Sequence, residues 1–572
     1  MQTPSSVELP LRLLTQRLGP LPLINHFIHR LSLAPILERC VPVGARPLTI
    51  SHATILGLLL RSLLIEREPV YRVQEAAADF APELLGLDTE QFASLRDDRI
   101  GRALDRFFEA DRAAVITEVV LGLGKHFGVR FDQLHNDSTS VSFCGQYRAA
   151  SGRKLRGNSA PAIVYGFSKD HRPDLKQLLF ILTVEGASGV PVAFRCADGN
   201  TEDSTTHLQT WNTLRAVAGR ADFLYVADSK LCVFDTLITI DRAGGRFLTV
   251  LPRSRREDTG FREWLQTNTP PWELVWDRDN PRHRDGPRDR WYVYKPELPS
   301  KEGWPVIWVW STLLTLHHAA SRDRRLAAAL EALRELKQRL AAPRGRRPKA
   351  EEVDLRVNQI LEQYHVTRYV KVTRMQREHS VFKQQRRGRP SKDTAYRKLT
   401  KYRVDIEWCI DQAIVAYDQR SDGTYPLLTN DRSLSPAQVL AAHKAQPKIE
   451  KRFEQLKTVH EIAPVYLHNE GRIEALFTLY FFALVVQALI ERELRQSMAA
   501  RNIEELPLYP EQRLTRRPTT EQVMRLFASV QCHTLHDASG HTVQRFPAQL
   551  NPLQCQVLDL LGVDRRAYES LG

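Results

Sequence analysis

Paired cysteines, a targeting segment and long hydrophobic runs are all lacking in this 572-residue sequence. Its seven cysteines are scattered with no Cys-x-x-Cys pair, which argues against a disulfide scaffold and is typical of a reducing compartment. The opening MQTPSSVELP lacks the basic-then-apolar pattern of a secretory signal. The longest apolar run, LFTLYFFALVVQALI, is shorter than a membrane span and predicts a buried helix. We therefore expect a soluble, cytoplasmic protein with no membrane partner.

Positive charge is in excess. The chain has 81 Lys and Arg against 67 Asp and Glu, which gives a net charge of +14 and a pI near 9.5. Such a balance favours a polyanionic partner, chiefly nucleic acid, although a basic protein without such a partner stays an alternative. Hydrophobic content of 42% is ordinary for a globular protein, so a substantial core can form.

The pattern of secondary structure changes near residue 130. Residues 1–126 carry apolar residues at helical spacing and predict an almost wholly helical region. Three strands follow (QLHNDSTSVSF, QLLFILTVE and PVAFRCADGN), and then helix, strand, helix and strand, with Asp203 or Ser204 as N-cap of the first helix. An antiparallel meander extended by parallel βαβ units is the order of a ribonuclease-H-like core.

A long insertion separates the end of this core from its beginning. It contains Trp-rich strands, a charged helix (SRDRRLAAALEALRELKQRL) and a strongly basic stretch, before YPLLTND and SPAQVLAAHKAQPKIEKRFEQLKTV predict a returning strand and one long helix. The fold class predicted is an α/β ribonuclease-H-like catalytic core with a mixed α+β insertion, preceded by an all-helical N-terminal domain. The predicted boundaries are a helical domain at 1–128, the core at 129–255 and 421–498, the insertion at 256–420 and a C-terminal region at 499–572.

Three acidic side chains could meet at one edge of the predicted sheet. Asp137 has the same parity as the apolar residues of its strand, and burying a lone charge is costly, so either the strand is wet there or the carboxylate faces a cleft. Asp228 ends the apolar strand in FLYVADS, where parallel sheets place functional groups. Glu450 lies next to the apolar stripe of the long helix.

Carboxylates gathered in this way suit hard cations such as Mg²⁺. Two such ions about 4 Å apart can activate an attacking oxygen and stabilise a leaving one in phosphoryl transfer. Taken singly, Asp228 could be a loop cap and Glu450 a solvated helix residue. Their joint placement in the right topological order is what favours a metal site.

The sequence resembles the DDE transposases of bacterial insertion sequences, in the group with a large insertion before the catalytic glutamate. The resemblance rests on LHNDSTSVSF, YGFSKDHRPDLKQL, GVPVAFRCADGNTEDSTT, YVADS, DGTYPLLTND and KIEKRFEQLKT, which span about 134–458. It implies that Asp137, Asp228 and Glu450 are the catalytic triad and bind Mg²⁺ or Mn²⁺, with two ions in the site. It also implies double-stranded DNA as partner and a homodimer or higher assembly.

Related families carry a Tyr–Arg–Glu–Lys box around the catalytic glutamate. With the box aligned on Glu450, Lys457 matches its lysine, whereas His443 and Gln446 stand at the Tyr and Arg positions. Lys457 is therefore expected to contact DNA phosphate, and the roles of the other two do not carry over.

A basic stretch at 383–403, KQQRRGRPSKDTAYRKLTKYR, is a second candidate for DNA contact, with nine basic residues against one Asp. Its centre, RRGRP, resembles an AT-hook, and the alternative is a solvated basic loop that binds phosphates without sequence preference. Both interpretations make Arg386, Arg387, Arg389 and Lys392 DNA-binding residues. The helical N-terminal domain is the candidate for binding the element's terminal repeats, because helices fit the major groove.

The sequence thus predicts a DNA transposase that cleaves insertion-sequence ends and joins the 3′-hydroxyls to target DNA. Two alternatives remain: a ribonuclease-H-like nuclease or resolvase without strand transfer, and a non-catalytic DNA-binding protein derived from a transposase. Four tryptophans of the insertion also have two alternative roles, because their rings could stack on an unpaired base or pack the inserted strands. They are Trp291, Trp304, Trp308 and Trp310.

Overall fold

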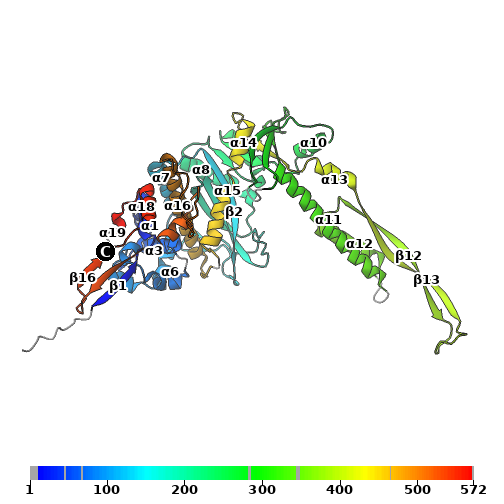
Figure 1. Cartoon of the computed structure of the whole chain (residues 1–572), viewed down its shortest axis with the longest axis horizontal. Helices are drawn as coiled ribbons and strands as arrows, with labels where there is room; N and C mark the ends of the chain where they lie inside the picture. Colours follow the sequence, from blue (N-terminus) through cyan, green and yellow to red (C-terminus); the bar gives the residue numbers. More distant parts are fainter. Residues whose placement is uncertain are drawn as a thin grey trace, which may run out of the picture. The chain divides into compact units, whose positions relative to one another are not determined.

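The protein is a mixed α/β structure that contains a large sheet. The computed structural model describes residues 11–43, 47–65, 68–280, 285–342, 348–463 and 465–569 (Figure 1). The chain divides into two compact units: Met1–Thr249 together with Ala441–Gly572, and Val250–Leu440.

Five strands form the sheet of the first unit: β2 (Gln133–Phe143), β5 (Lys176–Glu185), β6 (Pro191–Asp198), β7 (Leu224–Val226) and β8 (Arg246–Val250). Their order is β6-β5-β2-β7-β8. The β2–β5 and β5–β6 pairs are antiparallel, whereas β7 is parallel to both β2 and β8. Helices α8 (His207–Ala218) and α9 (Phe234–Arg242) connect the parallel strands. The predicted order, a meander followed by parallel units, is confirmed.

The apolar run of the sequence lies in α16 (Glu470–Ala500), which packs against β6, α3 (His52–Ile65) and α6 (Asp97–Glu109). In the part of the chain that the structure describes, α16 is the one helix long and apolar enough to cross a membrane by length and composition. Its most apolar window is 94% buried within the protein, as the sequence predicted for a buried helix.

The N-terminal region is not wholly helical, so that prediction is wrong at its first element. Strand β1 (Arg12–Arg17) pairs with β15 (Gln531–His536), and β15 pairs with β16 (Thr542–Phe546). A pairing partner more than 500 residues away leaves no local signal, and therefore the sequence pattern showed only the helices. The remaining elements of the first unit are α1 (Leu21–Arg30), α2 (Leu33–Cys40), α4 (Val73–Ala77), α5 (Thr89–Ser94), α7 (Arg112–Phe127), β3 (Lys154–Leu155), β4 (Asn158–Ser159), α17 (Thr520–Phe527), α18 (Pro552–Leu561) and α19 (Arg566–Glu569).

The single long helix predicted after the returning strand is also wrong. The structure has two helices, α14 (Pro436–His443) and α15 (Pro447–Glu454), followed by a wider turn of π-helix at Gln455–Val459. Pro447 lacks a backbone N–H, and its ring would clash with the carbonyl four residues earlier, so a continuous helix is broken there. At the first turn of α15 the same ring is well tolerated.

The second unit has its own antiparallel strands, in the order β14 (Thr424–Thr429), β11 (Val306–Ser311), β10 (Asp289–Tyr294) and β9 (Glu273–Arg278). The predicted Trp-rich strands are confirmed. Trp291, Trp304 and Trp308 are buried, and Trp310 stacks on Tyr292 with ring centroids 4.7 Å apart. Packing of the inserted strands therefore accounts for these rings.

A long ribbon completes the second unit. Strands β12 (Val370–Gln384) and β13 (Tyr396–Ile410) pair over their whole length, and in Figure 1 they extend beyond α12 (Ala350–Gln363). The base of the ribbon packs on α11 (Thr312–Ala341) and α12. The two ends of the basic stretch are thus β-structure, and residues 385–395 between them form the turn. Helices α10 (Arg256–Trp264) and α13 (Gln412–Gln419) complete this unit.

Candidate active site

Asp137 and Asp228 stand at equivalent positions on two neighbouring parallel strands. The pairing of β2 with β7 ends at His135 and Val226, and each aspartate lies two residues further along its strand direction. Parallel neighbours are about 4.8 Å apart, so this register brings the two carboxylates together at the carboxyl edge of the sheet. The structure thus joins two of the three acids that the sequence singled out.

The protein around these two carboxyl groups disfavours their charged forms. The pKa of Asp137 is raised to about 6, chiefly by burial and also by the neighbouring Asp228 and Asp203, which together outweigh the lowering effect of Lys169 and of the Ser138 N–H. Desolvation likewise raises the pKa of Asp228, although that carboxylate accepts the N–H of Lys230 at 3.0 Å. A positive charge beside the two carboxyl groups stabilises their charged forms.

Lys169 supplies one positive charge to this edge. Its ammonium lies 3.0 Å from Asp203 and 3.6 Å from Asp137, and it donates to the carbonyl and hydroxyl oxygens of Ser138 at 2.7 Å each. The Ser138 hydroxyl in turn donates to Asp203 at 2.6 Å. Lys169 and its partners form a compact polar network.

Asp203 is the residue that sequence reasoning missed. It was expected at the N-cap of a helix, but the N-cap of α8 is Thr206, and the Asp203 carboxylate belongs to the network of Lys169. Both residues lie in segments that carry the family resemblance, Lys169 in YGFSKDHRPDLKQL and Asp203 in GVPVAFRCADGNTEDSTT. Their location in these two segments was the feature of the sequence that could have identified both residues as part of the site.

The donor set fits a divalent cation, although no three-residue site is assembled. Among the described residues, no group of three His, Cys, Asp or Glu side chains is close enough together to hold a metal ion. The two carboxylates are nevertheless hard oxygen donors at one edge, with raised pKa values that Lys169, and for Asp228 also Lys230, offset only in part. The aspartate pair therefore fits Mg²⁺ or Mn²⁺.

Glu450 is exposed on α15 and is not part of the aspartate cluster. Helix α15 packs against β2 and β5. At one end Gln446 bonds the ring of His135 at 2.8 Å, and at the other Lys457 pairs with Asp170 at 2.5 Å. Because Asp137 is two residues from His135, it faces the side of the sheet that α15 covers.

These two contacts bracket Glu450 on the helix. Glu450 is four residues after Gln446, a rise of about 6 Å, and Asp137 is about 7 Å along β2 from His135. At 100° per residue, Glu450 lies about 40° around the helix from Gln446, whereas Glu454 lies about 80° around. Of the two glutamates, Glu450 is therefore the one nearer the face that looks toward Asp137.

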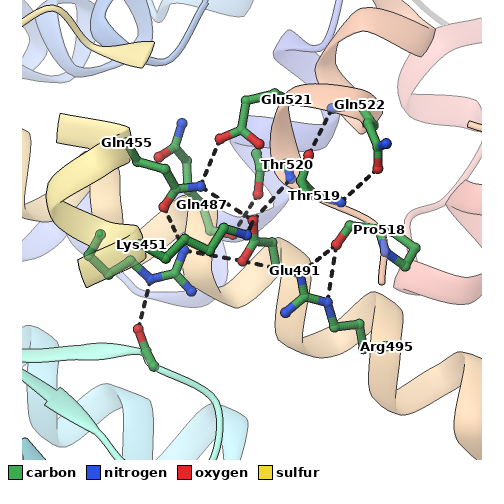
Figure 2. Close-up of polar contacts among 12 residues, drawn as sticks. Lys451, Gln455, Gln487, Glu491, Arg495, Pro518, Thr519, Thr520, Glu521 and Gln522 are labelled. Atoms are coloured by element: carbon green, nitrogen blue, oxygen red, sulfur yellow. Dashed lines mark hydrogen bonds and ion pairs between the residues drawn. The ribbon is translucent and has the colours of Figure 1, made fainter. Parts of the chain in front are cut away.

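A buried carboxylate fixes α15 in this position (Figure 2). Glu491 of α16 has a side chain only 1% exposed; it accepts from Lys451 at 2.6 Å and from Arg452 at 3.2 Å. Arg495 lies 3.6 Å away, and the N–H of Thr520 donates at 3.3 Å. Burial raises the pKa of Glu491, but these three cations outweigh burial and hold it below its usual value.

The same network brings in the C-terminal region. Gln455 accepts from Arg452 at 2.6 Å and donates to Glu521 of α17 at 2.7 Å. On the other side, Arg452 donates to the carbonyl of Gly189 in the β5–β6 turn at 2.8 Å. Helix α15 is thus held between the sheet and the C-terminal helices, a structural role for residues 499–572 that the sequence did not reveal.

The predicted DNA contacts lie in different surroundings. Lys457 is engaged by Asp170, and a phosphate would have to replace that carboxylate. Burial lowers the pKa of His443 to about 4, so this ring is neutral at physiological pH and unsuited to a phosphate. The four basic residues of the ribbon turn are exposed in the second unit; they are Arg386, Arg387, Arg389 and Lys392.

Known proteins match this chain only distantly. A family described as a domain of unknown function (DUF4277) matches residues 13–121, and no curated protein matches. Among solved structures, a piggyBac transposase synaptic complex with hairpin DNA is 7% identical, with 88% of this chain and 79% of that chain covered and a TM-score of 0.36.

Two Mos1 structures also match. A pre-cleavage Mos1 transpososome is 10% identical over 36% of this chain and 60% of that chain, and a Mos1 mariner paired-end complex with Mn is 12% identical over 40% and 66%. Both have a TM-score of 0.14. Similarity at these scores does not define a shared fold.

Proposed function

We propose that this protein is a cytoplasmic DNA transposase with a ribonuclease-H-like core. It would cleave the ends of a bacterial insertion sequence and join the 3′-hydroxyls to target DNA. The observation that carries the proposal is the placement of Asp137 and Asp228 at equivalent positions, each two residues beyond the last paired residue of the neighbouring parallel strands β2 and β7. The strand order β6-β5-β2-β7-β8 and the basic ribbon are in keeping with it.

In this proposal Asp137, Asp228 and Glu450 hold the metal. Two Mg²⁺ or Mn²⁺ ions bound there would activate the attacking oxygen and stabilise the leaving one. Glu450 would reach the strand carboxylates from α15, which Glu491 holds in place. Lys169 keeps the aspartates together when no ion is bound, because it already lies between Asp137 and Asp203.

DNA is the proposed partner, and a homodimer or larger assembly would hold two ends together. Lys457 would exchange Asp170 for a DNA phosphate, since the pair is partly exposed and a lysine ammonium makes charge-assisted hydrogen bonds to carboxylate and phosphate alike. The turn residues of the ribbon would contact phosphates without sequence preference.

The test is cleavage and joining of a duplex that carries the inverted repeats flanking the gene. Mg²⁺ or Mn²⁺ should support both steps, EDTA should abolish them, and Ca²⁺ should allow binding with little chemistry, because its looser coordination shell fits the site poorly. Asp137→Asn and Asp228→Asn should bind DNA and fail to cleave it. Asp174→Asn is the matched control, because Asp174 is exposed and pairs only with Arg172 within the described residues.

Each result has a definite meaning. Full cleavage in EDTA would exclude the metal mechanism. Cleavage without joining would identify a nuclease or resolvase. DNA binding by the parent chain with no cleavage under any condition would identify a non-catalytic DNA-binding protein.

A further inference from the structure

The outer half of the β12–β13 ribbon has two chemically different faces. Side chains alternate between the faces of a strand, and residues directly opposite each other share a face. The register places Arg377 opposite Arg403 and Lys383 opposite Arg397. Lys401, opposite His379, has the same parity and joins them. We call the face formed by these residues the odd face.

Charge is distributed unequally between the two faces. On strand residues 376–384 and 396–404 the odd face carries five cations and no acid; the cations are Arg377, Lys383, Arg397, Lys401 and Arg403. The even face carries one cation and one acid, Lys398 and Glu378, together with exposed rings. The net formal charge of the outer ribbon is therefore +5 on one face and zero on the other.

Little inside the protein balances the odd face. Arg377 lies 3.8 Å from Asp405 at the ribbon base, an acid that it shares with Lys337, and Arg403 donates to the Ala341 carbonyl. Lys383, Arg397 and Lys401 form no ion pair with any residue that the structure describes. Like charges directly opposite each other on a sheet are destabilising, so this arrangement favours an external anion.

The two faces of the ribbon differ in how far they are covered. At the base, Ile406, Val404 and Trp408 of the even face pack into the core between α11 and α12, and on the odd face Asp405 is buried beside Lys337 of α11. Further out on the odd face, Lys383, Arg397 and Lys401 are exposed. From Arg377 to Lys383 this surface runs about 20 Å, a length that spans several phosphates of a duplex.

We propose that the odd face of the ribbon binds the phosphates of double-stranded DNA, with the ribbon lying along the major groove. The groove is about 12 Å wide and admits a two-stranded ribbon. This binding surface is distinct from the basic turn at the ribbon tip. It rests on the proposed function only in taking DNA as the substrate.

A charge-transplant variant of the full chain tests the proposal. Lys383→Gln and Arg397→Gln remove two odd-face cations, and Ser380→Lys with Thr400→Lys places two cations on the even face, on an opposed pair of residues. Net charge is unchanged. Binding to a random duplex is measured in EDTA over a range of salt. We expect the slope of log K against log salt to fall by about 1.8, since each phosphate contact contributes about 0.9.

Two further variants keep the result interpretable. Ser380→Lys with Thr400→Lys alone should retain the parent slope or exceed it. Lys401→Gln, a single exposed change, should lower the slope by about 0.9, and it serves if the transplant does not fold. Circular dichroism and the midpoint of thermal unfolding verify that each variant is intact.

An unchanged slope in a folded transplant would overturn the proposal, because binding would then follow net charge alone. Tighter binding of double-stranded RNA than of DNA would overturn the choice of DNA. Binding in EDTA requires no cleavage, so a chain that never cleaves but loses DNA in the transplant would refute the proposed function and leave the ribbon surface standing.

Discussion

The carboxyl edge of the β2–β7 pair and the odd face of the ribbon are opposite in charge and in shape. At the edge, Asp137, Asp203 and Asp228 lie around the cation Lys169 and are partly withdrawn from water. On the ribbon, five cations extend along an exposed strand pair. Desolvated charge needs a close, compact counter-ion, whereas exposed charge along a line is matched by an extended polyanion. This contrast is the basis on which we propose a metal ion for one region and a nucleic acid for the other.

Solvent also explains why each region is stable without its partner. Water screens the ribbon cations, so their mutual repulsion is small when DNA is absent. Water is less available at the edge, where the raised pKa of Asp137 and the position of Lys169 reduce the repulsion between carboxylates. In the proposed mechanism, a metal that binds at this edge would displace protons or the lysine contact.

The largest effect on cleavage is expected when Glu450, the third acid of the proposed metal site, is replaced. Glu450→Gln keeps size and hydrogen bonding but removes the charge that a metal needs, so cleavage should fall by orders of magnitude while DNA binding persists. Glu454→Gln, one helical turn away, should stay within about tenfold of the parent, roughly 1.4 kcal/mol in barrier. Both variants are compared on one duplex that contains an element end.

The reverse outcome would contradict the orientation of α15 that we inferred from the contacts of Gln446 and Lys457. A dead Glu454→Gln enzyme beside an active Glu450→Gln enzyme would mean that the other side of α15 approaches Asp137.

Removal of the Glu491 carboxylate should cost the most stability. Glu491→Ala leaves three cations around a buried position without their partner, and breaking a buried pair in this way typically costs about 3–5 kcal/mol. The free energy of unfolding is measured with urea. Glu493→Ala, on the same helix but more exposed, should change it by less than about 1 kcal/mol. Equal losses in the two variants would show that the network does not anchor α15.

A smaller, pH-dependent effect is expected from Asp137→Asn in metal-free buffer. The folded pKa of Asp137 is about 6, above its ordinary value of 3.8, so the folded state takes up a proton over this interval. Stability from this group is therefore present below pH 4 and is lost as the pH rises through 6. The variant should melt a few degrees above the parent at pH 8 and together with it at pH 4. A constant difference across this range would contradict the shift.

The smallest effect concerns the ribbon tip. Arg386→Ala removes at most one phosphate contact and should lower the salt slope by about 0.9, without changing stability. Lys398→Ala, a single cation on the even face, should leave the slope unchanged. Equal effects of the two changes would mean that the tip and the even face contribute alike.

The sequence predicted the strands and the positions of Asp137 and Asp228 on them, because apolar alternation and apolar runs are patterns of neighbouring residues. The alternation in LHNDSTSVSF and the apolar run in FLYVADS set Asp137 and Asp228 on their strands, and the order of elements set those strands side by side. Asp203 was missed for a complementary reason. An Asp before a helix has an ordinary explanation as a cap, and only its contact with Lys169, 34 residues earlier, shows otherwise.

The ribbon escaped prediction because both faces of its outer half are wet. Without a buried face there is no apolar alternation over residues 376–404, and the β-structure is maintained by the pairing of two basic strands. The break before Pro447 carried a clear local signal, the proline itself, but the apolar periodicity on both sides suggested one helix. In both segments, the secondary structure suggested by the pattern of apolar residues differs from the secondary structure in the fold.

The interruption of the first unit by the second has a consequence for synthesis on the ribosome. About 220 residues separate Asp228 from Glu450. At about 5–20 residues per second, roughly 10–45 s pass between the emergence of the second acid and of the third. Glu491 emerges later still, and β1 waits for β15 near the end of the chain. A nascent chain therefore carries its complete basic ribbon before α15 can be anchored, so the proposed DNA affinity would precede the proposed catalytic competence in the life of each molecule.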